Sequence, residues 1–145
     1  MGAVPQKNAQ NKRKVINKYT AKGRELIHKN LAINTDAMLW LMRNPVKGRS
    51  IEYADNRISL FAAQYGKCAV TGLPMEVHDI HCHHKMPLSK GGTDAYENLI
   101  LVSKAIHVII HASSEITIRE YLNPLQLDDS KLAKLNKLRT MAEML

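Results

Sequence analysis

The sequence predicts an α+β fold that is mostly helical, in which a short β-hairpin and the helix after it lie among flanking helices. Apolar residues recur at helical spacing over most of the chain, and two short β-rich segments interrupt this pattern near its middle. The length of 145 residues, 45% of them hydrophobic, suits one small domain with a helical extension.

Three helices are expected before the hairpin. The first covers residues 10–31 and carries lysine and arginine among its apolar positions. The second is the short apolar segment 37–43, which stops before Pro45, and the third covers residues 54–65 and ends at Gly66. The apolar side of the third helix is expected to consist of Ile58, Phe61, Ala62 and Tyr65.

Two strands and a loop are expected in the middle of the chain. Residues 77–82 and residues 98–103 have strand character, and the Gly91-Gly92 pair marks the turn of the loop between them. Two antiparallel strands joined in this way form a hairpin.

Helical spacing returns after the second strand. It covers residues 104–112, and Ser103 is placed to cap this helix. Two further helices, separated by Asn123-Pro124, are expected in the C-terminal part of the chain.

Positive charge is concentrated in the first third of the chain. The formal net charge is +8, and residues 1–50 hold 11 basic residues against two acidic ones. This balance predicts an anionic partner, nucleic acid first and a membrane surface second. The side chains expected to contact phosphates are Lys12, Arg13, Lys14, Lys18, Lys22 and Arg24, with Lys85 and Lys90 near the histidines. The alternative for the N-terminal group is a solvated helix without a ligand.

Other classes of protein are excluded by what the sequence lacks. Two cysteines are too few for a disulfide scaffold or a four-cysteine zinc ribbon. No apolar run approaches the 18 residues of a membrane span, and the N-terminal residues have no apolar core of a secretory signal. We therefore expect a cytoplasmic protein with no membrane partner.

Six of the seven histidines lie within 34 residues. His107 and His111 are four positions apart on a predicted helix, so one face presents two nitrogen ligands for a metal ion. His83 ends the first strand, and the hairpin can fold it back over that helix. Three protein ligands leave coordination positions open, as in catalytic metal sites. His84 points to the other face of the strand, so it can stay unliganded and accept a proton from water.

Asn98 stands at the start of the second strand. Its side chain can hydrogen-bond the backbone across the hairpin and fix the loop that carries His84. Each residue also has a simpler interpretation, because a histidine pair on a helix is often surface or core and an asparagine after a loop is often a turn residue. Because these residues all occur in the right order within one strand–loop–strand–helix unit, the set is a far more specific signal of a functional site than any single member.

The segment HCHHKMPLSKGGTDAYENLILVSKAIHVIIHA resembles the HNH endonuclease motif, a ββα-metal unit. The resemblance implies that His83 is a metal ligand, that His84 is the general base and that Asn98 fixes the loop. It also implies that His107 and His111 are the metal ligands of the helix.

The wider stretch from about Tyr19 to Leu138 resembles the C-terminal part of bacterial group II intron-encoded reverse transcriptase/maturase proteins. In that family this part binds the DNA target, and its HNH unit nicks one strand. The resemblance divides the chain into a basic helical nucleic-acid-binding extension, 1–50, and an HNH nuclease domain, 51–145. Within the latter the ββα-metal core covers about 67–112 and C-terminal helices cover 113–145.

The sequence departs from many HNH domains in its cysteines. Those domains hold a structural zinc ion with two Cys-x-x-Cys pairs, whereas here Thr71 follows Cys68 at that spacing and Ser103 precedes the helix. No structural four-cysteine zinc is expected. Cys68 and Cys82 are expected to be buried thiols.

These features predict a metal-dependent endonuclease that hydrolyses DNA phosphodiester bonds, nicking a strand, with one divalent ion: Mg²⁺, Mn²⁺, Zn²⁺ or Ni²⁺. Imidazole ligands favour transition metals but leave the choice open. The expected partner is double-stranded DNA, with intron RNA as a second candidate. Two alternatives stay open: a catalytically idle DNA- or RNA-binding module left from a maturase, and a helical interaction protein whose histidines hold a structural zinc ion.

Overall fold

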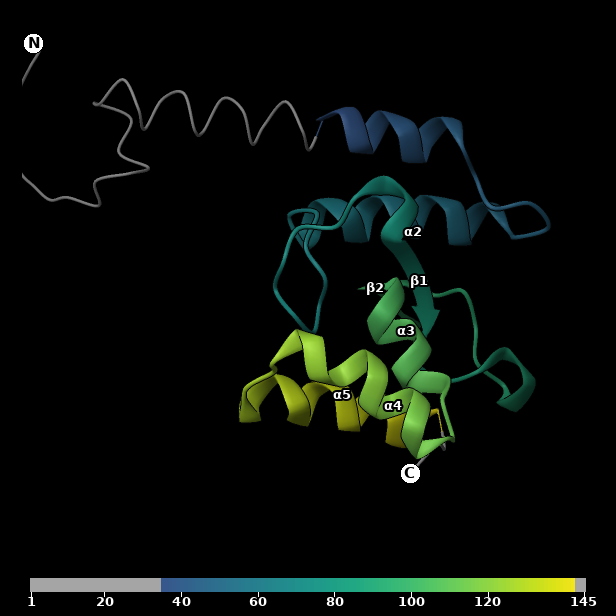
Figure 1. The fold of residues 1–145 in the computed structure, drawn as a ribbon. Helices are drawn as coiled ribbons and strands as arrows, with labels where there is room; N and C mark the ends of the chain where they lie inside the picture. The colour runs from purple at the N-terminus through teal and green to yellow at the C-terminus, as the bar shows by residue number, and fades with distance from the viewer. Residues whose placement is uncertain (1–34, 143–145) are drawn as a thin grey trace, which may run out of the picture. The chain divides into compact units, whose positions relative to one another are not determined.

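The computed structural model describes residues 35–142. The chain forms two units, residues 1–36 and residues 37–145, and nearly all of the first lies outside the described part. After a helical segment at residues 35–43, the elements follow in the order α2 (Ile51–Ala63), β1 (Ile80–His84), β2 (Leu99–Ser103), α3 (Lys104–His111), α4 (Glu115–Leu122) and α5 (Asp129–Met141) (Figure 1). The predicted α+β fold, a hairpin–helix unit among flanking helices, is confirmed.

Helix α2 begins three residues earlier than predicted because Ser50 caps it. The Ser50 hydroxyl accepts a hydrogen bond from the Tyr53 amide at 3.0 Å, which satisfies a free donor of the first turn. At the other end Tyr65 and Gly66 both have positive φ, and the Gly66 amide donates to the Phe61 carbonyl at 2.9 Å. This left-handed turn ends the helix at Ala63.

The buried face of α2 differs from the predicted one. Tyr53, Arg57, Leu60 and Phe61 are buried, whereas Ala62 and Tyr65 are exposed and Ile58 is half-buried. Tyr65 leaves the helical face because it lies in the left-handed turn beyond the helix end. Arg57 is accommodated inside because its guanidinium donates to the Asn44 carbonyl at 3.1 Å.

Strands β1 and β2 form an antiparallel hairpin in which His83 faces Ile100 and His84 faces Leu99. Directly opposed residues share a face of the sheet and successive residues alternate, so His83 and His84 lie on opposite faces. The first strand starts later than predicted, since Val77–Asp79 forms a 3₁₀ turn.

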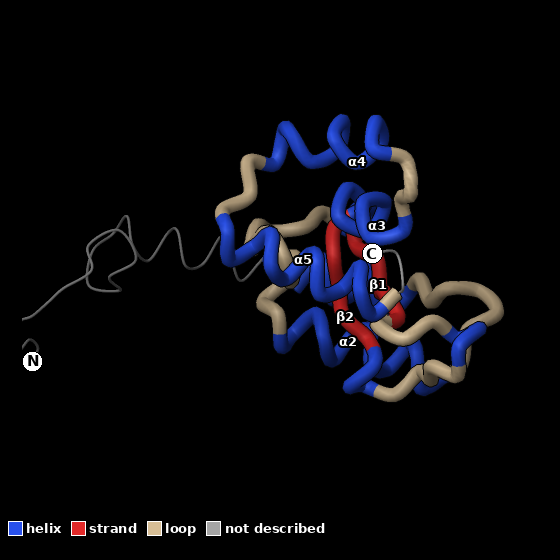
Figure 2. The backbone as a smooth tube through the Cα atoms, turned by 90° about the horizontal axis from the view of Figure 1, so that it is seen from below, coloured by secondary structure: helices blue, strands red, loops and turns tan. Residues whose placement is uncertain are grey.

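The two faces of the hairpin are covered by different helices. Helix α2 lies on one side and α3 with α4 on the other (Figures 1 and 2). Just after α2 the Gln64 side chain pairs with the backbone of Leu101 along the edge of β2, donating to its carbonyl at 2.9 Å and accepting from its amide at 3.0 Å. The buried core draws on the helical segment 35–43, both strands and helices α2, α3 and α5, while α4 adds the half-buried Ile118 and Leu122. Its most enclosed apolar side chains are Leu41, Phe61, Val70, Leu99, Leu101, Val102, Ile106, Ile109, Ile110 and Leu135.

Cys68 connects the turn before the hairpin to the start of α3. Its buried Sγ accepts hydrogen bonds from the Thr71 amide at 3.5 Å and the Ser103 amide at 3.4 Å. Ser103 caps α3 as predicted, with its hydroxyl accepting from the Ile106 amide at 3.4 Å. Cys82 is only half-buried, contrary to the prediction, because it lies at the edge of an open cavity described below.

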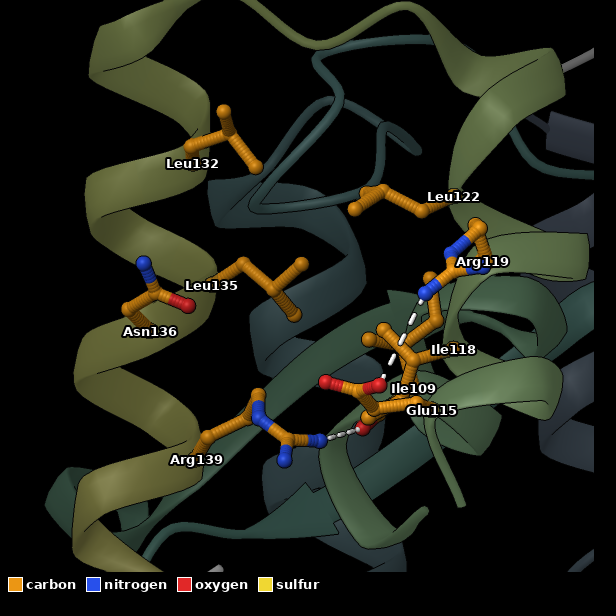
Figure 3. Close-up of a pocket in the computed structure, with 9 residues that line it drawn as sticks. All are labelled: Ile109, Glu115, Ile118, Arg119, Leu122, Leu132, Leu135, Asn136 and Arg139. Atoms are coloured by element: carbon orange, nitrogen blue, oxygen red, sulfur yellow. Dashed lines mark hydrogen bonds and ion pairs between the residues drawn. The ribbon is translucent and has the colours of Figure 1, made fainter. Parts of the chain in front are cut away.

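Helix α5 secures the C-terminal end of α3. The Arg139 guanidinium donates to the Ile109 carbonyl (Figure 3) and, at 3.0 Å, to the Ala112 carbonyl. The Ile109 carbonyl also accepts from the Ala112 amide at 3.3 Å, so Arg139 adds a second donor there, at a helix end where positive charge is favourable. The adjoining cavity of about 300 Å³ between α3, α4 and α5 is lined mainly by apolar side chains. The two predicted C-terminal helices are confirmed, with Asn123 and Pro124 between them.

None of the helices that the structure describes is long and apolar enough to span a bilayer.

Candidate active site

Three imidazoles meet between the hairpin and α3: His83 from β1, and His107 and His111 from α3. Their ring centroids are 5.4 Å apart for His83 and His107, 5.1 Å for His83 and His111, and 4.7 Å for His107 and His111. One ring nitrogen of each lies within 4.8 Å of the others. Nitrogens that bind one ion at about 2.1 Å lie about 3–4 Å from one another, so small side-chain rotations would bring these three nitrogens to binding distance of one ion.

The electrostatics of this cluster suit a cation. Burial, together with the neighbouring histidines His107, His111 and His84, lowers the pKa of His83 to about 3. Burial and the neighbouring His111 and His81 lower the pKa of His107 to about 4, and burial also lowers the pKa of His111. All three imidazoles are therefore neutral at pH 7, which is the form that binds metal.

The Nε2 atom of His83 gives the clearest sign that the cluster suits a cation. The side chain is only 2% exposed, and Nε2 has no hydrogen-bond partner in the described part of the chain. A buried polar atom without a partner costs about 1–3 kcal/mol, a cost that coordination removes. The three histidines therefore fit a divalent metal ion, and their group contains no carboxylate.

One open cavity of about 460 Å³ joins this cluster to His84. Its wall consists of Arg49, Tyr53, Cys82, His83, His84, Pro87, Leu88, Ser89, His107 and His111. His84, the last residue of β1, lines this cavity too, although it lies on the opposite face of the strand from His83. A substrate bound in this cavity can thus contact the metal ligands and His84 at once.

His84 is held by side chains that sequence reasoning did not identify. Its ring stacks on Tyr53 with centroids 5.6 Å apart, and its Nε2 lies 2.7 Å from Asp94 Oδ1 and 3.2 Å from Arg49 Nη2. The Arg49 guanidinium donates to the same Oδ1 at 3.0 Å, and the Ser50 hydroxyl donates to Oδ2 at 2.7 Å. The hydrogen bonds from His84 and Ser50 are the main reasons that the pKa of Asp94 is lowered, so its carboxylate is ionised.

Asn98 ties together the two sides of the loop between the strands. Its side-chain oxygen accepts from the Met86 amide at 2.8 Å, while its side-chain nitrogen donates to the Met86 carbonyl at 3.1 Å and the Thr93 carbonyl at 2.7 Å. The residue ends the 3₁₀ turn Tyr96–Asn98, one position before β2. These bonds fix the chain on both sides of the loop's tip.

Gly92 closes the same loop. Its amide donates to the Pro87 carbonyl at 2.9 Å, and a Cβ atom at this position would lie 1.9 Å from the Met86 carbonyl oxygen. Only glycine fits this close approach of two backbone segments.

The predicted phosphate contacts are only partly described. Lys90 is exposed at the end of the 3₁₀ turn Leu88–Lys90, and Lys85 lines a hollow of about 300 Å³ together with Lys134 and Lys137 of α5. The N-terminal group, Lys12, Arg13, Lys14, Lys18, Lys22 and Arg24, lies outside the described residues.

A β-hairpin and a following helix that together present three imidazoles able to hold a metal ion define a ββα unit with a candidate metal centre. Residues 67–113 match the family model described as HNH endonuclease, which supports the resemblance seen in the sequence. The match covers about a third of the chain and contains the three imidazoles, His84, Asp94 and Asn98. Comparisons with curated proteins and with solved structures gave no match, and the relationship to group II intron maturases is not shown.

Proposed function

We propose that this protein is a metal-dependent endonuclease of the HNH type that hydrolyses phosphodiester bonds in double-stranded DNA, nicking one strand. The observation that carries the proposal is a single cavity in which three neutral imidazoles stand beside a further histidine held by a carboxylate. Mere binding of nucleic acid does not require this combination.

His83, His107 and His111 would hold the divalent ion. When bound, the ion supplies a Lewis acid for a phosphate oxygen and for the leaving 3′ oxygen. A ligand group of nitrogen atoms without a carboxylate favours Mn²⁺, Ni²⁺ or Zn²⁺ over Mg²⁺, which prefers oxygen ligands.

His84 would act as the general base. It removes a proton from a water molecule whose oxygen forms the new bond to phosphorus, while the bond from phosphorus to the 3′ oxygen breaks. The leaving 3′ oxygen takes up a proton from solvent, so the products are a 5′-phosphate and a 3′-hydroxyl end. Asn98 contributes by fixing the loop that follows His84, through the three hydrogen bonds described above.

The DNA partner is supported by charge. The net charge is +8, and the basic side chains of residues 1–50, with Lys85 and Lys90, would contact phosphates. In this proposal residues 1–50 form the nucleic-acid-binding extension and residues 51–145 the nuclease domain. A cytoplasmic location stays a prediction of the sequence.

The proposal is tested with supercoiled plasmid and each of Mg²⁺, Mn²⁺, Zn²⁺ and Ni²⁺, with and without EDTA. We expect nicked circles with at least one ion, none with EDTA, and none with His83→Ala. His78→Ala is the matched control, because His78 is exposed and packs on Trp40 outside the cavity. Cleavage that persists in excess EDTA, or no cleavage with any of the four ions, would contradict the proposal.

The second candidate is a catalytically idle DNA- or RNA-binding module of a group II intron maturase. The strongly basic composition of residues 1–50 favours nucleic-acid binding in both cases. DNA or intron RNA binding at physiological salt without nicking under any metal condition would select this candidate.

A further inference from the structure

Side chains from two distant parts of the chain meet at one nitrogen atom of His84. Asp94 comes from the loop between the strands, and Arg49 from the residues just before α2. The Asp94 Oδ1 atom lies 2.7 Å from His84 Nε2 and 3.0 Å from Arg49 Nη2. The two nitrogens are themselves 3.2 Å apart.

The chemistry of the three groups determines where the protons lie. An ionised carboxylate only accepts hydrogen bonds and a guanidinium only donates them. The shortest contact, at 2.7 Å, therefore requires a hydrogen on Nε2 of His84. Arg49 and His84 then both donate to Oδ1, and the 3.2 Å between their nitrogens is the separation of two donors that share one acceptor.

A neutral imidazole carries one N–H, so a hydrogen on Nε2 leaves a lone pair on Nδ1. We propose that Asp94 is a positioning residue that fixes the Nε2–H tautomer of His84 and so makes Nδ1 the atom that accepts the proton from water. This inference rests on the proposed role of His84 as the general base. A carboxylate that orients a catalytic imidazole through its other nitrogen is the arrangement of the hydrolase triads.

Asp94 is itself fixed on several sides. The Ser50 hydroxyl donates to Oδ2 at 2.7 Å, and the Asn56 side chain donates to the Asp94 carbonyl at 2.8 Å. Arg49 also lies over the Tyr53 ring, 4.8 Å from its centroid, and Tyr53 stacks on His84. The N-terminal end of α2, which lies outside the matched residues 67–113, thus belongs to the positioning apparatus.

Arg49 has a second effect, through charge. A lone carboxylate beside the cavity would repel a phosphodiester, and the ion pair with Arg49 offsets that negative charge. Asp94 can then orient His84 without excluding the substrate.

The experiment uses the full chain and the variant Asp94→Asn, whose side chain has the same shape but no charge. We expect kcat on saturating DNA to fall about 10²- to 10⁴-fold, with the Kd for DNA and the Kd for Mn²⁺ changed less than about threefold. Asp94→Glu should recover part of the lost kcat. Glu97→Gln, an exposed change in the same loop, is the control and should behave like the unaltered protein.

A spectroscopic readout keeps this inference separate from the proposed function. In ¹⁵N-labelled full-length protein loaded with Zn²⁺, long-range ¹H–¹⁵N correlation should show His84 as the Nε2–H tautomer, with a mixture of tautomers in Asp94→Asn. An Nδ1–H tautomer in the unaltered protein would overturn the inference. So would a kcat unchanged by Asp94→Asn, or a loss of Mn²⁺ affinity as large as the loss of activity. If the unaltered protein never cleaves DNA, the proposed function fails while the tautomer still reports on Asp94.

Discussion

Burial of His83 links the chemistry of the site to the stability of the fold. Its side chain is 2% exposed, and its Nε2 has no partner among the described residues. A neutral imidazole tolerates this position far better than a charged one, since burial disfavours the imidazolium. Acidification should therefore lower the stability of the fold as well as protonate the candidate metal ligands.

The unfolding free energy of the metal-free protein should fall on acidification. The pKa is about 3 for His83 and about 4 for His107 in the folded chain, against about 6.5 in an unfolded chain. Between these values the unfolded state binds more protons, so stability rises with pH and is lost as the pH falls below about 6.5. Urea unfolding in EDTA from about pH 7 to about pH 5 measures this. In the double variant His83→Asn, His107→Asn the unfolding free energy should depend less steeply on pH. Equal slopes in the two proteins would contradict the assignment of this pH dependence to His83 and His107.

The loop glycines offer a second prediction at the residue scale. Gly92→Ala should destabilise the protein by about 2 kcal/mol or more, because the new Cβ would meet the Met86 carbonyl oxygen at 1.9 Å. Gly91→Ala is the matched control: φ is +91° there, but a Cβ would meet nothing within 4 Å, so about 1 kcal/mol is expected. Denaturant unfolding of the two variants compares their unfolding free energies. A Gly92→Ala protein of full stability would show that the backbones of Gly92 and Met86 do not approach each other so closely.

At the scale of elements, the sequence predicts those structural features that depend on residues close together in the chain. The hairpin, its following helix, the Ser103 cap and the break at Asn123-Pro124 all follow from signals a few residues long. The buried face of α2 was predicted only in part, with Phe61 right and Ala62 and Tyr65 wrong, because it depends on which other segments cover the helix. Arg49 and Asp94 were not identified for the same reason: they are 45 positions apart, and a basic loop residue and a turn aspartate have no distinctive local pattern.

Helix α5 should matter for the metal centre through Arg139. Arg139→Met removes two charge-assisted hydrogen bonds to the end of α3, which should cost about 2–3 kcal/mol and weaken metal binding by loosening the turn that carries His111. Arg119→Met, in the same cavity wall (Figure 3), is the control. Its exposed pair with Glu115 at 3.6 Å should contribute no more than about 0.5 kcal/mol. Equal effects of the two substitutions in urea unfolding and Mn²⁺ titration would contradict this role.

At the scale of the whole molecule, charge and chemistry lie mostly in different parts of the chain, with Arg49 as the residue that belongs to both. Residues 1–50 hold 11 of the 21 basic residues, whereas the imidazoles and the carboxylate that holds His84 lie between His83 and His111. This separation suits a protein whose affinity comes from phosphate contacts and whose reaction takes place in one small cavity.

Deleting residues 1–24 should therefore weaken binding to duplex DNA of any sequence and flatten its salt dependence. If four to six phosphates are neutralised, the logarithm of the binding constant should fall with that of the salt concentration at a slope of about −4 to −5 before the deletion. Fluorescence anisotropy at several salt concentrations measures both slopes. Metal affinity should not change, since the candidate ligands begin at His83. An unchanged slope would move the phosphate contacts to Lys85, Lys90 and their neighbours.

The central claim is that His83, His107 and His111 bind one ion while His84 stays free to act on water. Titration of Mn²⁺ into His84→Ala and into His83→Ala, paired with plasmid nicking by the same samples, tests it most directly. We expect His84→Ala to bind one ion with nearly unchanged affinity while nicking falls about 10²- to 10⁴-fold, and His83→Ala to lose both. An equal loss of Mn²⁺ affinity in the two variants would contradict the division of roles between His83 and His84.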